Sequence, residues 1–159
     1  MGANAWRGLY SVISIAGFAL FVYGYGLARQ TPVLLYAPPM WLRHVAWLLM
    51  LPVFPLLFAA YLPGRIKAAL KHPMLVAVKT WALAHLLANG MLADVLLFGG
   101  FLAWAVVDRI SLKRRVLRPV AGAPLSPWND VIAVVGGLAV YAITLIWLHR
   151  VLIGMPLLQ

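Results

Sequence analysis

Residues 72–109 read HPMLVAVKTWALAHLLANGMLADVLLFGGFLAWAVVDR, and this stretch decides the fold. It consists of two apolar runs joined at Asn89-Gly90. Glycine readily takes the left-handed conformation that ends a helix, and asparagine is the next best residue there. The pattern therefore predicts two helices folded back on each other, over residues 73–89 and 91–108. We expect the rest of the chain to form a scaffold around this hairpin.

The composition is that of an integral membrane protein. The chain has 159 residues, of which 65% are hydrophobic and only 10% are charged. Its mean hydropathy is +0.96, whereas soluble domains carry about 25% charged residues. It contains no cysteine, which excludes disulfides, thiolate metal sites and cysteine nucleophiles. At this length we expect one transmembrane domain over residues 1–159 and no separate soluble domain.

The apolar runs predict an all-α, polytopic transmembrane helical bundle of about five spans. These spans are expected at residues 8–28, 41–62, 73–89, 91–108 and 130–153. Pro52 and Pro55 each remove a backbone donor, so the second span should kink near its middle. Asn129 or Asp130 is expected to cap the last span. Small residues predict close helix contacts at Ser11, Ser14, Gly17 and Gly24, at Gly99 and Ala103, and at Ala133 and Gly137.

The basic residues are divided unevenly between the two predicted sides of the membrane. One side collects Arg7, Arg65, Lys67, Lys71, Arg109, Lys113, Arg114, Arg115 and Arg118, and the other collects Arg29, Arg43 and Arg150. The positive-inside rule predicts that the richer side, with the N-terminus and the basic loops, is cytoplasmic. The net charge of +10 forms no continuous basic face, so the expected partner is the lipid bilayer and not nucleic acid.

The polar residues of the hairpin are the candidate site. His85 and Asn89 are four residues apart and therefore share a helix face. Asp94 follows the turn at about the distance at which His85 precedes it, so a His85–Asp94 hydrogen bond is expected. Such a partner would fix the imidazole tautomer and raise its basicity. The alternative is that Asn89 and Asp94 only satisfy the turn near the headgroups. His72, at the start of the same helix, is either a ligand contact or simply a hydrated helix start.

Several other kinds of site are disfavoured by the sequence. The three acids, Asp94, Asp108 and Asp130, lie at different predicted depths and form no carboxylate pair for hydrolysis. No chain of acids and bases crosses the predicted membrane, which argues against a proton-coupled transporter. His44 and His149 fall at the outer interface, where we expect them to act as anchors unless the fold brings them together.

The hairpin resembles the NnrU family of bacterial membrane proteins, through HPMLVAVKTWALAHLLANG followed by LLFGGFLAWAVVDR. The flanking segments WRGLYS, PPMWLRHVAWLLM, YLPGRIK and WLHRVLIG resemble it too, so the likeness covers nearly the whole chain. The family is named for an association with denitrification and nitric oxide metabolism. It is similar to the plant and cyanobacterial 15-cis-zeta-carotene isomerases, which are membrane proteins that use haem b with histidine ligation.

The resemblance implies that this chain binds haem b in the hairpin. His85 falls on a haem-ligand position of the isomerase motif and is the expected metal ligand. His72 falls on the His-Pro pair that precedes it and is the expected secondary contact, with Asn89 or Asp94 orienting the ring. Ala82 stands where the isomerase motif has a cysteine, so isomerase activity is implied less strongly than haem binding.

The resemblance also implies a further N-terminal helix. Family members usually begin with an apolar helix that bears a histidine, ahead of the segment that starts here at Met1-Gly2. Either the start assigned to this chain is too late, or it is a five-span variant. A five-span variant would recruit its second ligand from His44, His149 or a partner chain.

Two functions follow as expectations. The first is a bacterial inner-membrane protein of nitrogen-oxide metabolism that binds haem b and carries out isomerase-like or redox chemistry. The second is a non-enzymatic accessory or assembly subunit of a nitrogen-oxide reductase system. It would act through a homo-oligomer or a partner membrane subunit. Whether the protein is an enzyme stays open at this point.

Overall fold

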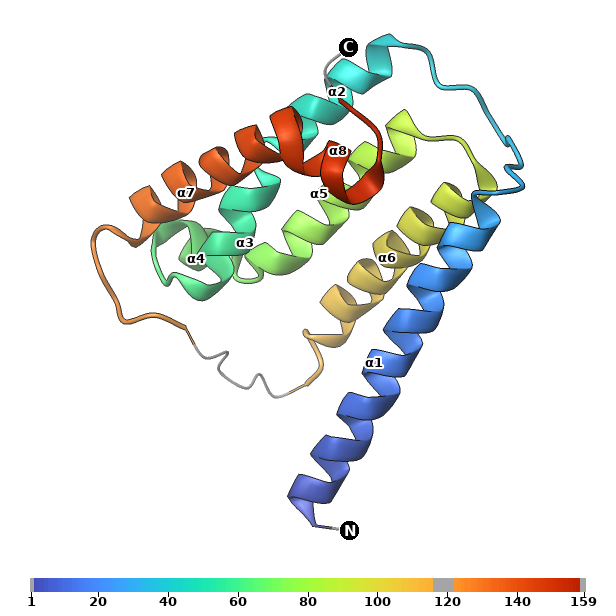
Figure 1. Ribbon diagram of the computed structural model, residues 1–159. Coiled ribbons are helices and arrows are strands. Elements are labelled where there is room, and N and C mark those ends of the chain that lie inside the picture. The colour runs from blue at the N-terminus through green and yellow to red at the C-terminus, as the bar shows by residue number, and fades with distance from the viewer. Residues whose placement is uncertain (1, 116–121, 158–159) are drawn as a thin grey trace.

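The computed structural model describes residues 2–115 and 122–157, and its regular elements are helices (Figure 1). Their order is α1 (Ala3–Ala28), α2 (Trp41–Met50), α3 (Val53–Tyr61), α4 (Arg65–Leu70), α5 (Pro73–Ala88), α6 (Leu92–Ser111), α7 (Asn129–Ile143), the π-helical turn η1 (Thr144–Leu148) and α8 (His149–Ile153). The predicted all-α fold is confirmed. Arg118, one of the cations counted for orientation, lies outside the described residues.

Three helical stretches are long and apolar enough to cross a membrane within the described part of the chain. They are Asn4–Ala28, Trp41–Tyr61 and Asn129–Ile153. The hairpin helices fall short of this standard. α5 has 16 residues, about 24 Å at 1.5 Å per residue, and α6 contains Asp94, Asp108 and Arg109. Three of the five predicted spans therefore have the length and composition to cross a membrane, and for the two hairpin helices spanning stays a prediction.

The second span is divided as its prolines predict. α2 ends at Met50 and α3 begins at Val53, with a turn at Leu51-Pro52 between them. α3 packs against both α5 and α7, and α2 packs against α5. The core lies at this junction, where Val53, Leu56 and Ala77 are buried.

The predicted small-residue contact is formed on α7. Ala133 and Gly137 are buried, and a methyl group built on Gly137 would lie 2.5 Å from Cα of Pro55 on α3. The two helices therefore approach as closely as backbones allow. By contrast, a methyl group at Gly17, Gly24 or Gly99 would meet nothing within 4 Å. The predicted contacts at those glycines are not made within the described part of this chain, because α1 and the outer face of α6 have no helix beside them there.

The hairpin turn is fastened by the connector between α1 and α2. The backbone N–H groups of Leu35 and Tyr36 donate to the Gly90 carbonyl oxygen, at 2.9 and 3.3 Å, and Leu92 donates to Val33 at 2.8 Å. The Tyr36 hydroxyl donates to the carbonyl oxygens of Leu86 and Asn89 at the end of α5. Burial and the Asp94 carboxylate raise the pKa of Tyr36, so its hydroxyl stays a donor. The turn is thus part of a packed structure and not a free loop.

α1 lies along α6 and touches little else (Figure 1). A hydrogen bond joins it to the hairpin, from the Tyr25 hydroxyl to the Asp94 carboxylate, at 2.5 Å. Phe21 meets Phe101 edge to face with ring centroids 6.3 Å apart. The remaining surface of α1 is exposed, as expected for a helix that contacts lipid or a partner helix.

The two ends of the bundle differ in charge. α4 and the end of α6 lie at one end of the bundle, with the start of α1 projecting away on the same side, and the hairpin turn and the start of α2 lie at the other end (Figure 1). The first end carries most of the cations, as the sequence predicts. Among them, Arg115 forms an ion pair with Asp108.

Candidate functional site

His85 lies one turn before the end of α5, in an aromatic setting. Its ring stacks on Phe98 of α6 with centroids 4.5 Å apart and planes 27° apart, and it lies 5.2 Å from Trp81. Its Nδ1 is 2.9 Å from the Trp81 carbonyl oxygen. A carbonyl oxygen can only accept, so Nδ1 must carry the hydrogen. Nε2 then bears the lone pair, and this is the atom that a neutral histidine offers to a metal.

Nε2 of His85 is accessible. It has no hydrogen-bond partner among the described residues. Within that same part of the chain, no side-chain nitrogen or oxygen is both sealed from solvent and unpaired. The ring is therefore held by one nitrogen while the other is free to react or to coordinate. This is the arrangement that protein metal sites use to orient a histidine ligand.

The predicted hydrogen bond between His85 and Asp94 is wrong. Asp94 accepts from Tyr25 instead. The Asn89 side-chain amide donates to the His85 backbone carbonyl at 2.9 Å, and not to the ring. The cause is the turn, because Asn89 and Met91 are extended and α6 begins only at Leu92. This shifts the register of the hairpin, so Phe98 and not Asp94 lies opposite His85.

A cavity of about 330 Å³ opens beside His85, near the sparsely charged end of the bundle. Its walls come from α2, α3, α5, α7, η1, α8 and the C-terminal segment. The polar side chains that line it are Arg43, His85, Asn89, Tyr141, Thr144 and His149, and most of the other lining residues are apolar. Among the described residues, no aspartate or glutamate side chain lines the cavity. The cavity is therefore mostly apolar, with the positive charge of Arg43 and the hydrogen-bond acceptor nitrogen of His85 at its wall.

His149 enters this cavity from the other side of the bundle. It follows the π-helical turn η1, and its backbone N–H donates to the Thr144 carbonyl five residues earlier. Such π-helical insertions are frequent at functional sites. The His149 Nδ1 is 2.7 Å from the Met155 carbonyl oxygen, so by the argument used for His85 its Nε2 is the acceptor. Gly154, at φ +78°, makes the left-handed turn that brings Met155 back toward the ring.

The other two histidines are not part of the cavity lining. His72 precedes α5, about 20 Å from His85 along a helix that rises 1.5 Å per residue. It is therefore not a secondary contact of His85, contrary to the sequence-based expectation. Burial, followed by the charge of Arg109, lowers the pKa of His72. His44 is exposed and lies edge to face with Trp47, with ring centroids 5.2 Å apart.

The residues of the cavity do not form a site for a bare metal ion. No group of three or more histidine, cysteine or acidic side chains that could hold an ion occurs in the described part of the chain. A first-row metal ion usually takes three or four protein ligands.

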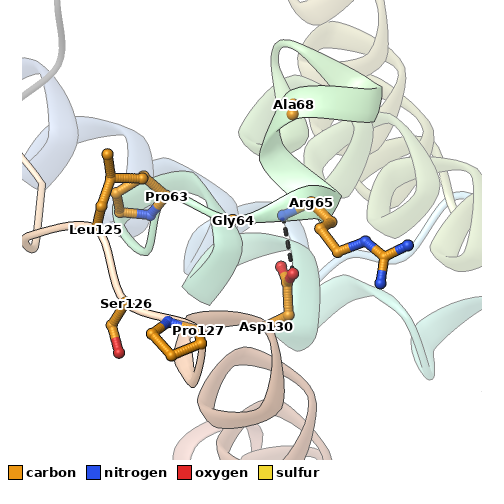
Figure 2. A pocket seen from close by; sticks show the side chains of 8 residues that line it. All are labelled: Pro63, Gly64, Arg65, Ala68, Leu125, Ser126, Pro127 and Asp130. Atoms are coloured by element: carbon orange, nitrogen blue, oxygen red, sulfur yellow. Dashed lines mark hydrogen bonds between the residues drawn. The ribbon is translucent and has the colours of Figure 1, made fainter.

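A second hollow lies at the basic end and is structural (Figure 2). Its Asp130 carboxylate points at the backbone of α4, and the Arg65 guanidinium points away from it (Figure 2). The carboxylate accepts from the backbone N–H groups of Arg65 and Ile66, at 2.8 and 3.1 Å. Asp130 thus caps α4 and not α7, contrary to the expected cap of the last span. Asn129 is buried and donates to two backbone carbonyls, so it does not cap α7 either.

The Trp81 carbonyl, which anchors the His85 ring, was not predicted from the sequence, although its i−4 position within the same helix could have indicated it. His149 was one of the three alternatives for a second ligand, and it lines the cavity, whereas His44 does not. Its hydrogen bond to the Met155 carbonyl was not predicted.

The comparisons with known proteins identify the family. Residues 1–157 match the family model described as NnrU protein. No curated protein and no solved structure gives a match. Because the family model covers essentially the whole chain, this protein belongs to the NnrU family.

Proposed function

We propose that the protein binds haem b in the cavity beside His85, with Nε2 of His85 as an axial ligand. The observation that carries the proposal is the hydrogen bond from Nδ1 to the Trp81 carbonyl. It fixes the ring and its tautomer, and it leaves Nε2 as an accessible acceptor beside an apolar cavity. Imidazole held in this way is a standard axial ligand of haem iron.

The other lining residues suit a haem. Ala46, Met50, Phe54 and Leu145 offer apolar walls for the macrocycle. Arg43 offers a guanidinium for a propionate, which is the pairing that arginine geometry favours. Among the described residues, no lining side chain carries a carboxylate that would repel the propionates. At about 330 Å³ the cavity is near the lower limit for organic ligands.

The proposed role is redox chemistry in nitrogen-oxide metabolism, in a bacterial inner membrane. The family name supports the metabolic assignment. Bound haem supplies a one-electron couple at the iron. Isomerase-like chemistry on an apolar polyene has less support, because Ala82 replaces the thiol of the isomerase motif. Asn89 holds the end of α5 through its bond to the His85 carbonyl, and Asp94 holds α1 through Tyr25. Asn89 and Asp94 would therefore position the His85 imidazole indirectly, through the helices that they hold.

One observation favours the second candidate, an accessory subunit. α1 is apolar over 25 residues and none of its best membrane-spanning window is buried. Such a helix offers room for a partner membrane subunit or a second copy of the chain. Co-purification with an intact terminal reductase, lost when the outer face of α1 is changed, would support this reading.

The spectroscopic test of haem binding is direct. The full chain is purified in detergent from haem-replete cells, and its spectra are recorded oxidised and reduced. Ferric protoporphyrin IX is also titrated into protein freed of cofactor. We expect saturable binding with a Soret shift, and no equivalent shift with metal-free protoporphyrin IX, which cannot be ligated.

Three variants make the test specific to His85. His85→Ala should abolish saturable binding. His85→Asn should do the same, although its amide can still donate to the Trp81 carbonyl, so loss of haem would not reflect loss of that bond. His44→Ala is the matched control, because His44 is exposed and outside the cavity, and it should bind normally. A wild-type protein without a Soret band, or a His85→Asn variant that binds as well as the wild type, would refute the proposal.

The proposed orientation places the basic end in the cytoplasm. Arg7 near the start of α1, Arg65 and Lys67 of α4, and Arg109 and Lys113 at or just after the end of α6 fall on the predicted basic side, which supports this reading through the positive-inside rule. The chain has no cysteine, so single cysteines introduced at Gln30 or Lys113 give unambiguous labelling with an impermeant maleimide. Gln30 should react from the outside in intact cells and Lys113 only after lysis. The reverse pattern would overturn the assignment.

A further inference from the structure

The open end of the hairpin brings the start of α5 beside the end of α6. Trp81 on α5 packs against Phe101 on α6, with ring centroids 5.5 Å apart, and the two helices run antiparallel (Figure 1). Between two and three turns of about 3.6 residues separate Trp81 from His72, and Phe101 from Arg109. Lys71, His72 and Arg109 therefore lie together, and we call these three residues the hairpin base.

The carboxylates near the hairpin base are already engaged. The chain has only three acidic residues, and one of them lies in the first turn of α6, at the other end of the bundle. Asp108 pairs with Arg115, and Asp130 accepts from the backbone N–H groups at the start of α4. Among the described residues, no carboxylate lies within ion-pair distance of Lys71 or Arg109.

The positive charges of the hairpin base act on one another. Burial and the charge of Arg109 lower the pKa of His72, Asp108 opposes this shift, and Lys71 adds to it. The two cations therefore reach the same ring and repel a third positive charge there. Lys113 and Arg114, which follow α6, are exposed and also lack a carboxylate partner within the described chain. An anion from outside the chain would relieve this repulsion.

Apolar side chains lie next to these cations. Leu70 precedes Lys71, and Ile110 follows Arg109, and the two apolar side chains are 37% and 50% exposed. A free phosphate ion needs no apolar neighbour, whereas a phospholipid carries its acyl chains beside its phosphate. This end of the bundle is also the one predicted to face the cytoplasmic leaflet, whose anionic lipids attract basic segments next to membrane helices.

We propose that the hairpin base binds the phosphate of an anionic phospholipid between Lys71 and Arg109, with its acyl chains against Leu70 and Ile110. The lipid would join the end of α4 to the end of α6 and so hold the open end of the hairpin together. The connector between α1 and α2 already fastens the other end, at the turn. This proposal does not depend on haem, because the hairpin base lies outside the cavity.

The test uses the full chain in lipid nanodiscs. The discs contain phosphatidylcholine with a rising fraction of phosphatidylglycerol, bound lipid is counted by native mass spectrometry, and unfolding is followed by heating. The melting temperature of the wild type should rise with phosphatidylglycerol and saturate. Lys71→Gln and Arg109→Gln should each bind phosphatidylglycerol about fivefold more weakly, the usual effect of one Lys or Arg near an anionic surface.

The same variants in pure phosphatidylcholine separate lipid binding from folding. There they should melt at or above the wild-type temperature, because the loss of one charge relieves repulsion in the hairpin base. Lys71→Arg keeps the charge and should bind lipid as the wild type does. Lysine, glutamine and arginine all carry a Cβ, so the φ of +62° at this position costs the three residues alike.

Two control variants distinguish a site from a generally basic surface. Arg7→Gln removes a cation from the same predicted side, on the start of α1 that projects away from the bundle (Figure 1). Arg150→Gln removes an exposed cation from the predicted opposite side. Both should bind phosphatidylglycerol as the wild type does.

Three results would overturn the proposal. The first is a wild type whose melting temperature does not depend on phosphatidylglycerol. The second is a loss of binding in Arg7→Gln as large as that in Lys71→Gln, which would indicate a diffuse attraction. The third is equal stabilisation by inorganic phosphate added to phosphatidylcholine discs, which would show that acyl chains play no part.

Discussion

Replacing Gly137 by alanine tests the contact that holds α7 against α3, next to the cavity. The added methyl group would lie 2.5 Å from Cα and 2.6 Å from Cδ of Pro55. Carbon atoms in favourable contact are about 3.5–4.0 Å apart, so the overlap exceeds 0.9 Å. The atoms that it meets belong to a proline ring and to the backbone, which cannot rotate away. The two helices must therefore separate.

The expected cost follows from these distances. Overpacking of a tight core costs about 1–3 kcal/mol, and a backbone obstacle places Gly137→Ala at the upper end of that range. Alanine recovers about 1 kcal/mol through its better helix propensity. The net destabilisation is about 2 kcal/mol, or about a thirtyfold fall in the ratio of folded to unfolded protein.

The assay compares three glycine variants in one detergent. Unfolding is followed by circular dichroism as the mole fraction of sodium dodecyl sulphate is raised. Gly100→Ala on α6 is the matched control, because nothing lies within 4 Å of its added methyl group, and it should be neutral or slightly stabilising. Gly136→Ala, whose methyl group would lie 3.1 Å from the Phe58 ring, should fall between the two. Equal stability of the Gly137 and Gly100 variants would refute the packing argument.

Three further predictions follow from the hairpin and its surroundings. Gly90→Ala should prevent the turn from closing, because the added methyl group would overlap the Tyr36 carbonyl, whose carbon would be 2.8 Å away. The turn should then lose its resistance to proteases, and a resistant variant would contradict this geometry. Tyr25→Phe should weaken the attachment of α1 by about 1.5–3 kcal/mol, the usual value of a hydrogen bond to a charged group such as Asp94. A spin label on α1 should become more mobile, and unchanged mobility would show that the bond does not hold the helix. Burial lowers the pKa of His72 below its unfolded value of about 6.5. The unfolded state therefore binds more protons than the folded state, and the free energy of unfolding should fall as the pH drops through that value. A melting series in detergent should show this fall for the wild type and a flatter profile for His72→Gln.

The helices could be predicted from the sequence because their signals are local. Asn89-Gly90 marks the hairpin turn, and Pro52 marks the break in the second span, with boundaries close to those observed. The contact at Gly137 was also predictable, because a small residue every four positions indicates a close helix crossing. The same pattern on α1 meets no helix within the described chain. A small-residue pattern shows that a helix can be approached closely, but it does not show which surface approaches it.

The internal geometry of the site was less predictable. Counting residues from the turn placed Asp94 opposite His85, but an extended turn shifts the register and places Phe98 there. The position of His149 depends on a π-helical turn, on the reversal at Gly154, and on the packing of α7 against α3. None of these long-range relations has a signature in the local sequence. His85 itself was identified through its family resemblance and its place near the turn.

The break at Leu51-Pro52 gives the two halves of one span different neighbours. α3 packs between α5 and α7, whereas α2 packs mainly against α5 and is joined to α7 by the Tyr141 hydroxyl, which donates to the Trp47 carbonyl oxygen at 2.9 Å. Most of the cavity wall that this span supplies comes from α2, and α3 adds Phe54. The proline break therefore lets one half of the span line the cavity while the other half forms the tight contact with α7.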